Sequence, residues 1–245
     1  MIKSRIIVSF LLKKNGFYKT TNFKNPVYIG DPINTIRIFT EKKVDEIIIY
    51  DIDATINNTL PNYNLLKILA SETRMPICYG GAVKSIEIAK KLFELGIEKI
   101  SLNNAIFDNL DLLKLLIKNF GSQSIVTTLD ISKNNTNGVY RVSSQYGKNF
   151  AKIDLLDLIK KLEKIGIGEI IINNIDLDGT MKGYDKNLIN KIYNSVSIPV
   201  SFVGGAKSFK ELEDIISNFK IIGLAAGSIF FYKGIHKAVL FSYPN

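Results

Sequence analysis

The fold is decided by the stretch Ser201-Phe202-Val203-Gly204-Gly205-Ala206-Lys207-Ser208, because a near copy of it, Ile77-Cys78-Tyr79-Gly80-Gly81-Ala82-Val83-Lys84-Ser85, lies far upstream. Each copy has the pattern of a short buried strand, a Gly-Gly turn and a Lys/Ser start to a helix. The two Gly pairs, which begin at positions 80 and 204, lie 124 residues apart, about half of the 245-residue chain.

Neighbouring segments repeat with nearly the same offset. Residues 50–55 (YDIDAT) correspond to residues 175–180 (IDLDGT), and residues 102–107 (LNNAIF) correspond to residues 226–230 (AGSIF). Because this period is far longer than that of a solenoid, the repeat indicates one fold built from two similar halves.

Short runs rich in Ile and Val alternate with amphipathic helical patterns along the whole chain. We predict eight strands, at 5–12, 46–50, 76–79, 99–102, 125–129, 169–173, 199–202 and 221–225, and eight helices, at 32–43, 64–73, 85–95, 110–120, 155–165, 186–194, 208–218 and 232–240. Such alternation implies parallel strands with helical crossovers, and eight of them close into a (β/α)8 TIM barrel of about this size. Residues 1–245 are therefore expected to form a single domain.

Composition narrows the function classes. The chain is 46% hydrophobic and has one cysteine, which excludes an intrachain disulfide and a cysteine metal cluster and favours a cytoplasmic protein. No apolar run suits a signal peptide or a membrane span. The net charge is +9, but the lysines are dispersed over helices, so we expect no nucleic-acid partner. No metal-ligand spacing or dinucleotide fingerprint occurs, so no metal or cofactor is expected.

Two long connections, residues 13–30 and 132–152, each follow a predicted strand. Both should therefore lie at the C-terminal face of the barrel, where barrel active sites form. Connections of this length are typical of functional lids.

The Gly-Gly turns are candidate phosphate sites, because glycine lets backbone N–H groups approach an anion at a helix N-terminus. Gly204-Gly205 and Gly227-Ser228 end consecutive strands and could hold one phosphate, and Gly80-Gly81 and Asn103-Asn104 could hold a second. Tight strand-to-helix packing is the alternative. Because the pairs are duplicated and have polar partners, we favour phosphate binding over tight packing. Two phosphate sites suggest a ligand that is phosphorylated at both ends.

Carboxylates gather at the same face. Five of them lie at or just beyond strand ends, which exceeds what helix capping requires: Asp51, Asp53, Asp130, Asp176 and Asp178. General acid–base chemistry is therefore plausible. Asp130 ends the fifth strand, and its counterpart in the first half is Leu11, so the first half lacks this carboxylate.

Charged residues also begin four of the strands: Arg5, Glu46, Lys99 and Glu169. They could be solvated strand ends, or they could form a ring of ion pairs that closes the bottom of the barrel. The pattern alone leaves these two readings open. His236 and Cys78 are expected to be packing or surface residues.

Taken together these residues resemble the HisF family, the cyclase subunit of imidazole glycerol phosphate synthase, over nearly the whole chain. The motifs that carry the resemblance are Arg5-Ile6-Ile7, Lys19, Gly30-Asp31-Pro32, Asp45-Glu46, Gly80-Gly81, Ser101-Leu102-Asn103, Gly121-Ser122-Gln123, Gly168-Glu169 and residues 176–185 (DLDGTMKGYD). The family takes ammonia from a glutaminase subunit docked at the N-terminal face of the barrel. The ammonia crosses the barrel and reacts with a bis-phosphorylated ribonucleotide, which gives imidazole glycerol phosphate and an aminoimidazole carboxamide ribotide.

The resemblance implies roles for individual residues. Arg5, Glu46, Lys99 and Glu169 match the family's ammonia gate, and Asp130 matches one of its two catalytic aspartates. The substrate- and phosphate-binding positions are matched by Lys19, Gly81, Asn103, Asn104, Asp178, Gly179, Gly205, Gly227 and Ser228.

Three positions depart from the family's pattern. The second catalytic aspartate is Leu11, the preceding cysteine is Ser9, and Ala82 stands where a third glycine is usual. Leucine cannot transfer a proton, so either another carboxylate such as Asp51 substitutes for it or the chemistry has changed. The alternatives are a paralogue that conducts ammonia to a separate amidotransferase making amidinated surface sugars, and a non-catalytic phosphate-binding scaffold.

Overall fold

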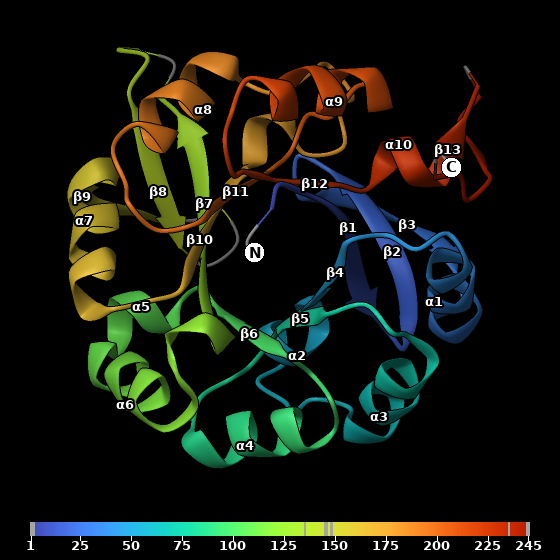
Figure 1. The fold of residues 1–245 in the computed structure, drawn as a ribbon, viewed down its shortest axis with the longest axis horizontal. Helices are drawn as coiled ribbons and strands as arrows, with labels where there is room; N and C mark the ends of the chain where they lie inside the picture. Colours follow the sequence, from blue (N-terminus) through green and yellow to red (C-terminus); the bar gives the residue numbers. More distant parts are fainter. Residues whose placement is uncertain (1–2, 135, 145–146, 148, 235, 244–245) are drawn as a thin grey trace.

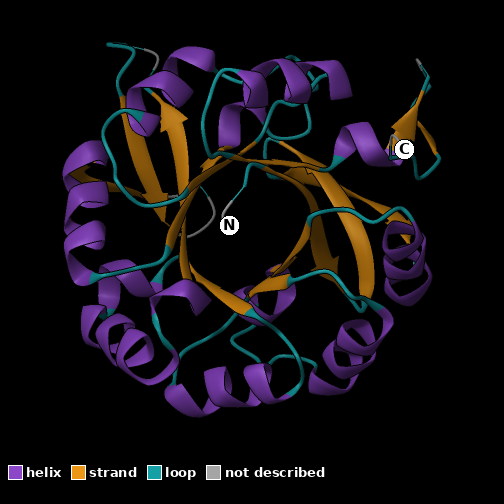
Figure 2. Ribbon diagram, viewed as in Figure 1, coloured by secondary structure: helices purple, strands orange, loops and turns teal. Residues whose placement is uncertain are grey.

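The computed structural model describes residues 3–134, 136–144, 147, 149–234 and 236–243, and it shows a closed barrel of eight parallel strands (Figures 1 and 2). The barrel strands are β1 (Arg5–Lys13), β4 (Glu46–Asp51), β5 (Ile77–Gly80), β6 (Lys99–Leu102), β7 (Ile125–Lys133), β10 (Glu169–Asn174), β11 (Val200–Val203) and β12 (Gly223–Ala226). They pair in the order β1-β4-β5-β6-β7-β10-β11-β12, and β12 pairs with β1 to close the ring. The (β/α)8 prediction is confirmed.

Helices cover the outside of the barrel between successive strands (Figure 2). The longer helices are α1 (Pro32–Glu41), α3 (Tyr63–Glu72), α4 (Ile86–Glu94), α6 (Leu110–Phe120), α7 (Leu155–Ile165), α8 (Lys186–Tyr193) and α9 (Phe209–Ser217). Short turns of helix follow four strands: α2 (Ile52–Ile56), α5 (Ala105–Asp108), η2 (Ile175–Leu177) and α10 (Ser228–Phe231), with η1 (Ser122–Ser124) preceding β7.

The helix boundaries follow from local chemistry. Asp31 caps α1 with its carboxylate, and Pro32 occupies the first turn, where no backbone donor is needed. Ser85 and Ser208, the last residues of the two repeated stretches, cap α4 and α9 in the same way. Gly166 ends α7 in the left-handed conformation, at φ +96°. The internal repeat is therefore present down to the hydrogen bonds of the caps.

The helix predicted over residues 232–240 is wrong. The last helical turn, α10, comes earlier, and β13 (Tyr232–Lys233) and β14 (Ala238–Val239) form a small antiparallel pair instead. Gly234 and Lys237 both adopt positive φ, which a right-handed helix excludes. Phe231 stacks on Phe10 at 5.1 Å, so the apolar residues of this segment enter the core directly after β12. Ile235 lies outside the described residues, and His236 is exposed in the turn.

The two long connections are β-hairpins, which the sequence reading did not predict. β2 (Gly16–Thr21) and β3 (Lys24–Gly30) continue from β1, and β8 (Tyr140–Ser144) and β9 (Asn149–Asp154) continue from β7. The C-terminal ends of β1 and β7 extend beyond the barrel, where β1 pairs antiparallel with β2 and β7 pairs antiparallel with β8. The two hairpins lie on opposite sides of the barrel (Figure 1). Positions 135, 145–146 and 148 lie outside the described residues.

The core has two parts. The larger one fills the space between strands and helices, and the smaller one lies inside the barrel, where Ile7, Ile48, Cys78, Val126 and Ile171 form an apolar layer. Side chains alternate along each strand, so every second residue points into the barrel. Residues two positions before this apolar layer therefore lie inside the barrel near its N-terminal end, and residues two positions after it lie inside near the mouth. Among the described residues no helix is long and apolar enough to cross a membrane.

Candidate functional site

The C-terminal mouth of the barrel holds two adjoining cavities. One, of about 250 Å³, lies over the first half of the chain, and the other, of about 40 Å³, lies over the second half. We name them the first-half cavity and the second-half cavity. Both are bounded by the same five residues, which form a shared wall: Leu11, Thr20, Phe23, Tyr50 and Asn173.

Asp130 lies on β7 and faces the first-half cavity with 8% of its surface exposed. Its two oxygens accept hydrogen bonds from the amides of Asn173 at 2.8 Å and Asn103 at 3.0 Å. Burial raises the pKa of Asp130 to about 6, and the two amides offset part of this rise. A carboxyl with this pKa can both take up and release a proton near neutral pH, as general acid–base chemistry requires.

Leu11 occupies the matching place on β1 and puts an apolar side chain between the two cavities. The nearest candidate to replace a carboxylate there, Asp51, also lines the first-half cavity. Its Oδ1 accepts from the backbone of Ala54 at 2.9 Å and its Oδ2 from the hydroxyl of Tyr79 at 3.0 Å. Asp51 therefore caps α2 and holds Tyr79, so both of its oxygens already have donors.

The second-half cavity is closed on one side by the β2–β3 hairpin. Lys19 contacts Asp178 at 2.7 Å, and the Thr20 hydroxyl donates to the other oxygen of Asp178 at 2.7 Å. At the tip, the backbone N–H of Asn22 donates to the carbonyl of Asp178 at 2.9 Å. A Cβ on Gly179 would lie 2.1 Å from the carbonyl oxygen of Thr20, so only glycine allows the hairpin to come this close.

The far side of this cavity is formed by Gly205, Gly227 and Ser228. Gly205 has φ +105°, and a Cβ there would lie 2.2 Å from the carbonyl oxygen of Gly183. The hydroxyl of Ser228 is buried and has no hydrogen-bond partner among the described residues, and the same is true of Oδ1 of Asn173. Buried polar atoms without partners are costly, which is typical of groups that await a ligand.

The corresponding groups of the first half have partners. The backbone N–H of Ala82 donates to the hydroxyl of Thr55 at 3.2 Å, and the amide of Asn103 donates to the Thr128 carbonyl as well as to Asp130. Gly81 and Asn104 line the same cavity. Ala82 adopts φ +50°, a conformation that glycine would adopt without strain.

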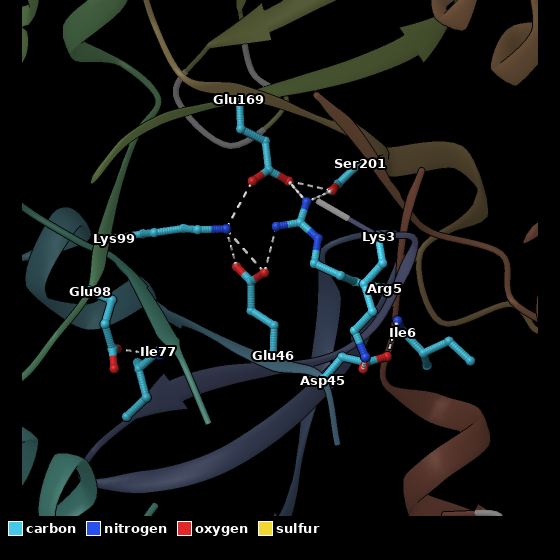
Figure 3. Close-up of polar contacts among 10 residues, drawn as sticks. All are labelled: Lys3, Arg5, Ile6, Asp45, Glu46, Ile77, Glu98, Lys99, Glu169 and Ser201. Carbon is cyan, nitrogen blue, oxygen red and sulfur yellow. Dashed lines mark hydrogen bonds and ion pairs between the residues drawn. The ribbon is translucent and has the colours of Figure 1, made fainter. Parts of the chain in front are cut away.

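The four charged residues at the strand starts pair with one another at the opposite end of the barrel (Figure 3). We name Arg5, Glu46, Lys99 and Glu169 the charged ring. Arg5 contacts Glu46 at 2.9 Å and Glu169 at 2.7 Å, and Lys99 contacts the same two carboxylates at 2.9 and 3.0 Å. Of the two readings that the sequence left open, the structure shows the ring of ion pairs.

The ring has two positive and two negative members, so its formal charges cancel. Burial raises the pKa of Glu169, but attraction to Arg5 and Lys99 lowers it by more, and the net shift is downward. Burial lowers the pKa of Lys99, and the two glutamates more than reverse this. Glu169 and Lys99 are therefore charged at neutral pH. Breaking one partner out of such a buried network leaves an uncompensated charge.

Two of the five rim carboxylates do not line either cavity. Asp53 accepts from the backbone of Lys14 at 2.8 Å, and Asp176 accepts from the backbone of Lys133 at 2.7 Å. Each anchors the point where a hairpin leaves its barrel strand. Cys78 is buried inside the barrel, where burial raises the pKa of its thiol well above the ordinary value. Within the described ranges no group of three or more His, Cys, Asp or Glu side chains is placed to hold a metal.

Sequence reasoning missed the residues of the shared wall other than Leu11. Asn173 and Tyr50 face the barrel interior, like Glu169, Ile171, Glu46 and Ile48 earlier on the same strands, so period-two alternation could have identified them. Thr20 and Phe23 belong to the β2–β3 hairpin, which packs against Asp178, and no local sequence pattern predicts this contact.

Comparison with known proteins places these features in a family. A sequence model described as "Histidine biosynthesis protein" matches residues 5–236. A Pseudomonas aeruginosa protein with the provisional name imidazole glycerol phosphate synthase subunit hisF2 is 46% identical over all 245 residues and 97% of its own length. A provisionally named HisF subunit of Leptospira borgpetersenii is 43% identical over the same residues and 96% of its length. The imidazole glycerol phosphate synthase subunit HisF of Saccharolobus solfataricus is 34% identical over 97% of this chain and 93% of its own.

Proposed function

Since this chain belongs to the HisF family of imidazole glycerol phosphate synthase subunits, we propose that it takes ammonia from a glutaminase partner and delivers it through the barrel to a bis-phosphorylated ligand at the mouth. The glutaminase would dock at the N-terminal face, over the charged ring. The observation that carries the proposal is that one barrel holds both a closed charged ring at its bottom and, at its mouth, a buried Asp130 whose pKa is raised to about 6.

The interior between these ends suits ammonia rather than ammonium. The apolar layer offers no charged partner, and moving an unpaired cation into such surroundings is strongly unfavourable. Above the layer, the hydroxyls of Tyr50, Thr128 and Ser101 form a connected group, with oxygens 3.1 and 2.7 Å apart. A small neutral molecule leaving the apolar layer would meet hydrogen-bonding groups there, directly below the cavities.

At the mouth, each half would hold one end of the ligand. Lys19, Gly205, Gly227 and Ser228 would bind one phosphate in the second-half cavity, where the buried Ser228 hydroxyl has no protein partner. Gly81, Asn103 and Asn104 would bind the other end, with Asp178 and Gly179 holding the hairpin closed. Asp130 would exchange a proton with the reacting centre between them. In the family's reaction the products are imidazole glycerol phosphate and an aminoimidazole carboxamide ribotide.

Leu11 favours a second candidate function. An apolar side chain stands between the cavities at the position of a catalytic aspartate, and Asp51 is engaged as the cap of α2 and as the acceptor of the Tyr79 hydroxyl. In this alternative the barrel conducts ammonia to a separate amidotransferase that makes amidinated surface sugars, and the cyclase chemistry has been lost.

Turnover of the bis-phosphorylated ribonucleotide with a high concentration of ammonium salt decides between these functions. Ammonium removes the need for a partner, so the assay reports the chemistry of the mouth alone. The proteins to compare are wild type, Leu11→Asp and Asp130→Asn, with Asp53→Asn as a matched control, because Asp53 is a rim carboxylate outside both cavities. Wild-type turnover that Asp130→Asn abolishes supports the cyclase. No turnover in folded wild type, with some restored by Leu11→Asp, supports the conduit.

A further inference from the structure

The charged ring contains a fifth polar group, the hydroxyl of Ser201 on β11. Ser201 is completely buried, and its Oγ donates to Oε1 of Glu169 at 2.5 Å (Figure 3). Nη2 of Arg5 donates to the same Oε1 at 2.7 Å, while Lys99 donates to Oε2 at 3.0 Å. Glu169 therefore has three donor groups, one of which is uncharged and lies on the rigid wall of the barrel.

Glu46 is held less completely. Its carboxylate accepts from Nη1 of Arg5 at 2.9 Å and from Lys99 at 2.9 and 3.1 Å. Among the described residues no hydroxyl donates to it. The two carboxylates of the ring thus share both cations and accept three hydrogen bonds each, but only Glu169 has a third donor group, the Ser201 hydroxyl.

The position of the hydroxyl depends on the neighbouring strand. Gly223 on β12 pairs in register with Ser201, and a Cβ at Gly223 would lie 1.9 Å from the Ser201 Oγ. The hydroxyl occupies the space that a side chain at position 223 would take. Two residues from adjacent strands therefore combine to place one donor against Glu169.

We infer that Ser201 is a positioning residue of the charged ring, which fixes Glu169 in place so that the ring opens at Glu46. When a cation moves aside, Glu169 keeps the other cation and the hydroxyl, whereas Glu46 keeps one cation only. Both carboxylates lose a donor, and the buried carboxylate with fewer remaining donor groups is the costlier one to leave in place, so Glu46 is the side chain that moves. The inference rests on the proposed ammonia path, since opening matters only if ammonia passes between these side chains.

The electrostatics of the ring agree with this assignment. The titratable groups around Glu169 are Arg5, Glu46 and Lys99, with the Cys78 thiol and the Tyr50 hydroxyl farther along the interior. Burial raises the pKa of both carboxyls. At Glu169 the attraction of Arg5 and Lys99 and the hydrogen bond from Ser201 outweigh burial and lower the pKa, whereas at Glu46 burial and repulsion by Glu169 raise it.

The test is the titration of the Glu169 carboxyl, followed by carbon-13 NMR of glutamate-labelled protein, with the resonance assigned by its loss in Glu169→Gln. Removing a hydrogen bond to a charged acceptor is expected to move the midpoint upward by about one pH unit or more in Ser201→Ala. An unchanged midpoint would overturn the inference. The matched control is Ser143→Ala, which removes another fully buried hydroxyl far from the ring and should leave the midpoint where it is in wild type.

Gly223→Ala gives an independent route to the same effect, because its methyl group would displace the Ser201 hydroxyl. We expect its midpoint to rise as in Ser201→Ala. Where the added methyl prevents folding, the Ser201→Gly/Gly223→Ala double variant removes both close contacts, the Ser201 Oγ at 1.9 Å and its Cβ at 2.8 Å, and should titrate like Ser201→Ala. A Glu169 midpoint at the wild-type value in the double variant contradicts the inference.

A second readout separates this inference from the proposed function. With the glutaminase partner present, the amount of imidazole glycerol phosphate formed per glutamine hydrolysed should fall about two- to tenfold in Ser201→Ala, while turnover driven by ammonium salt stays unchanged. A shifted midpoint with an unchanged glutamine ratio means that Ser201 positions Glu169 but ammonia does not pass there. An unchanged midpoint rejects the role of Ser201 whatever the ratio.

Discussion

The two halves of the barrel mouth have the same arrangement of backbone turns but differ in the hydrogen bonds that their side chains form with those turns. Ala82 and Ala206 follow the two Gly-Gly turns, and Thr55 and Thr180 end the matching YDIDAT and IDLDGT segments. In the first half Thr55 accepts the N–H of Ala82, whereas in the second half the Thr180 hydroxyl donates to the carbonyl of Leu177.

The same contrast holds elsewhere in the mouth. Asp130 on β7 corresponds to Leu11 on β1, and the smaller cavity is lined by the hydroxyl of Ser228, for which the described part of the chain offers no hydrogen-bond partner. The first half has a roomy cavity whose donors are largely engaged, and the second half has a small cavity with a free hydroxyl. The two halves thus share turns and caps, which the backbone requires, while a few side chains make the two cavities different.

The largest expected effect concerns the pair Asp130 and Leu11. If Asp130 is the acid–base group, Asp130→Asn should lower ammonium-driven turnover by about 10²–10⁴-fold, because an amide cannot exchange a proton near neutral pH and its oxygen replaces only one of the two acceptors that Asn103 and Asn173 contact. The logarithm of wild-type turnover should also bend near pH 6, where the Asp130 carboxyl titrates. Steady-state kinetics across pH 5–8 measures both. Turnover in Asp130→Asn within about threefold of wild type would show that the carboxylate is not the proton carrier.

The next largest expected effect is the change in the free energy of unfolding with pH that the titration of Asp130 causes. Its pKa is raised in the folded protein, so the native state binds the proton more tightly than the unfolded state does. The resulting stability is complete below about pH 4 and is lost as pH rises through about 6. The loss is on the order of 2–3 kcal/mol. The pKa values of Asp51 and Glu46 are raised as well, so urea unfolding from pH 4 to 7 should show a loss of stability in both proteins that is larger in wild type than in Asp130→Asn by this amount. Parallel pH profiles would contradict the assigned environment.

Features that depend on local sequence patterns could be predicted, and features that depend on contacts between distant segments could not. The period-124 repeat, the Gly-Gly turns and the Asp130–Leu11 difference are local patterns, so the barrel could be predicted from them and is confirmed, whereas the two phosphate sites at its mouth stay predictions. The hairpin docking of Thr20 and Phe23, and the bond from Thr55 to Ala82, join segments far apart in the chain. The prediction of a helix at 232–240 was wrong because Phe231 packs on Phe10 in the core and Gly234 forms a turn with positive φ, and helical periodicity in the sequence reports neither contact nor turn.

A third prediction sharpens the comparison at Ser228. Ser228→Ala removes a buried hydroxyl that has no protein partner, so the free protein should lose no stability. Affinity for inorganic phosphate should fall about tenfold, the usual worth of a hydrogen bond to a charged group. Titration calorimetry measures the affinity. Thr127→Val is the matched control, because the Thr127 hydroxyl is also buried and unpartnered but lines neither cavity, and its phosphate affinity should equal that of wild type.

The smallest effect would make the first half resemble the second. Thr55→Val keeps the shape of the side chain but removes the acceptor of the Ala82 N–H, which then faces the first-half cavity unpaired. The free protein should lose about 0.5–1.5 kcal/mol of stability, and phosphate binding in this half should strengthen by a few-fold, because the anion restores the lost bond. Amide shifts of Gly81 and Gly205 during a phosphate titration report the two halves separately. Thr180→Val is the matched control, since its hydroxyl donates to Leu177 and holds no N–H of the Gly-Gly turn. Tighter binding at Gly81 in Thr55→Val alone would show that one threonine, rather than the backbone, holds the first grip closed, and equal responses in the two variants would reject that explanation.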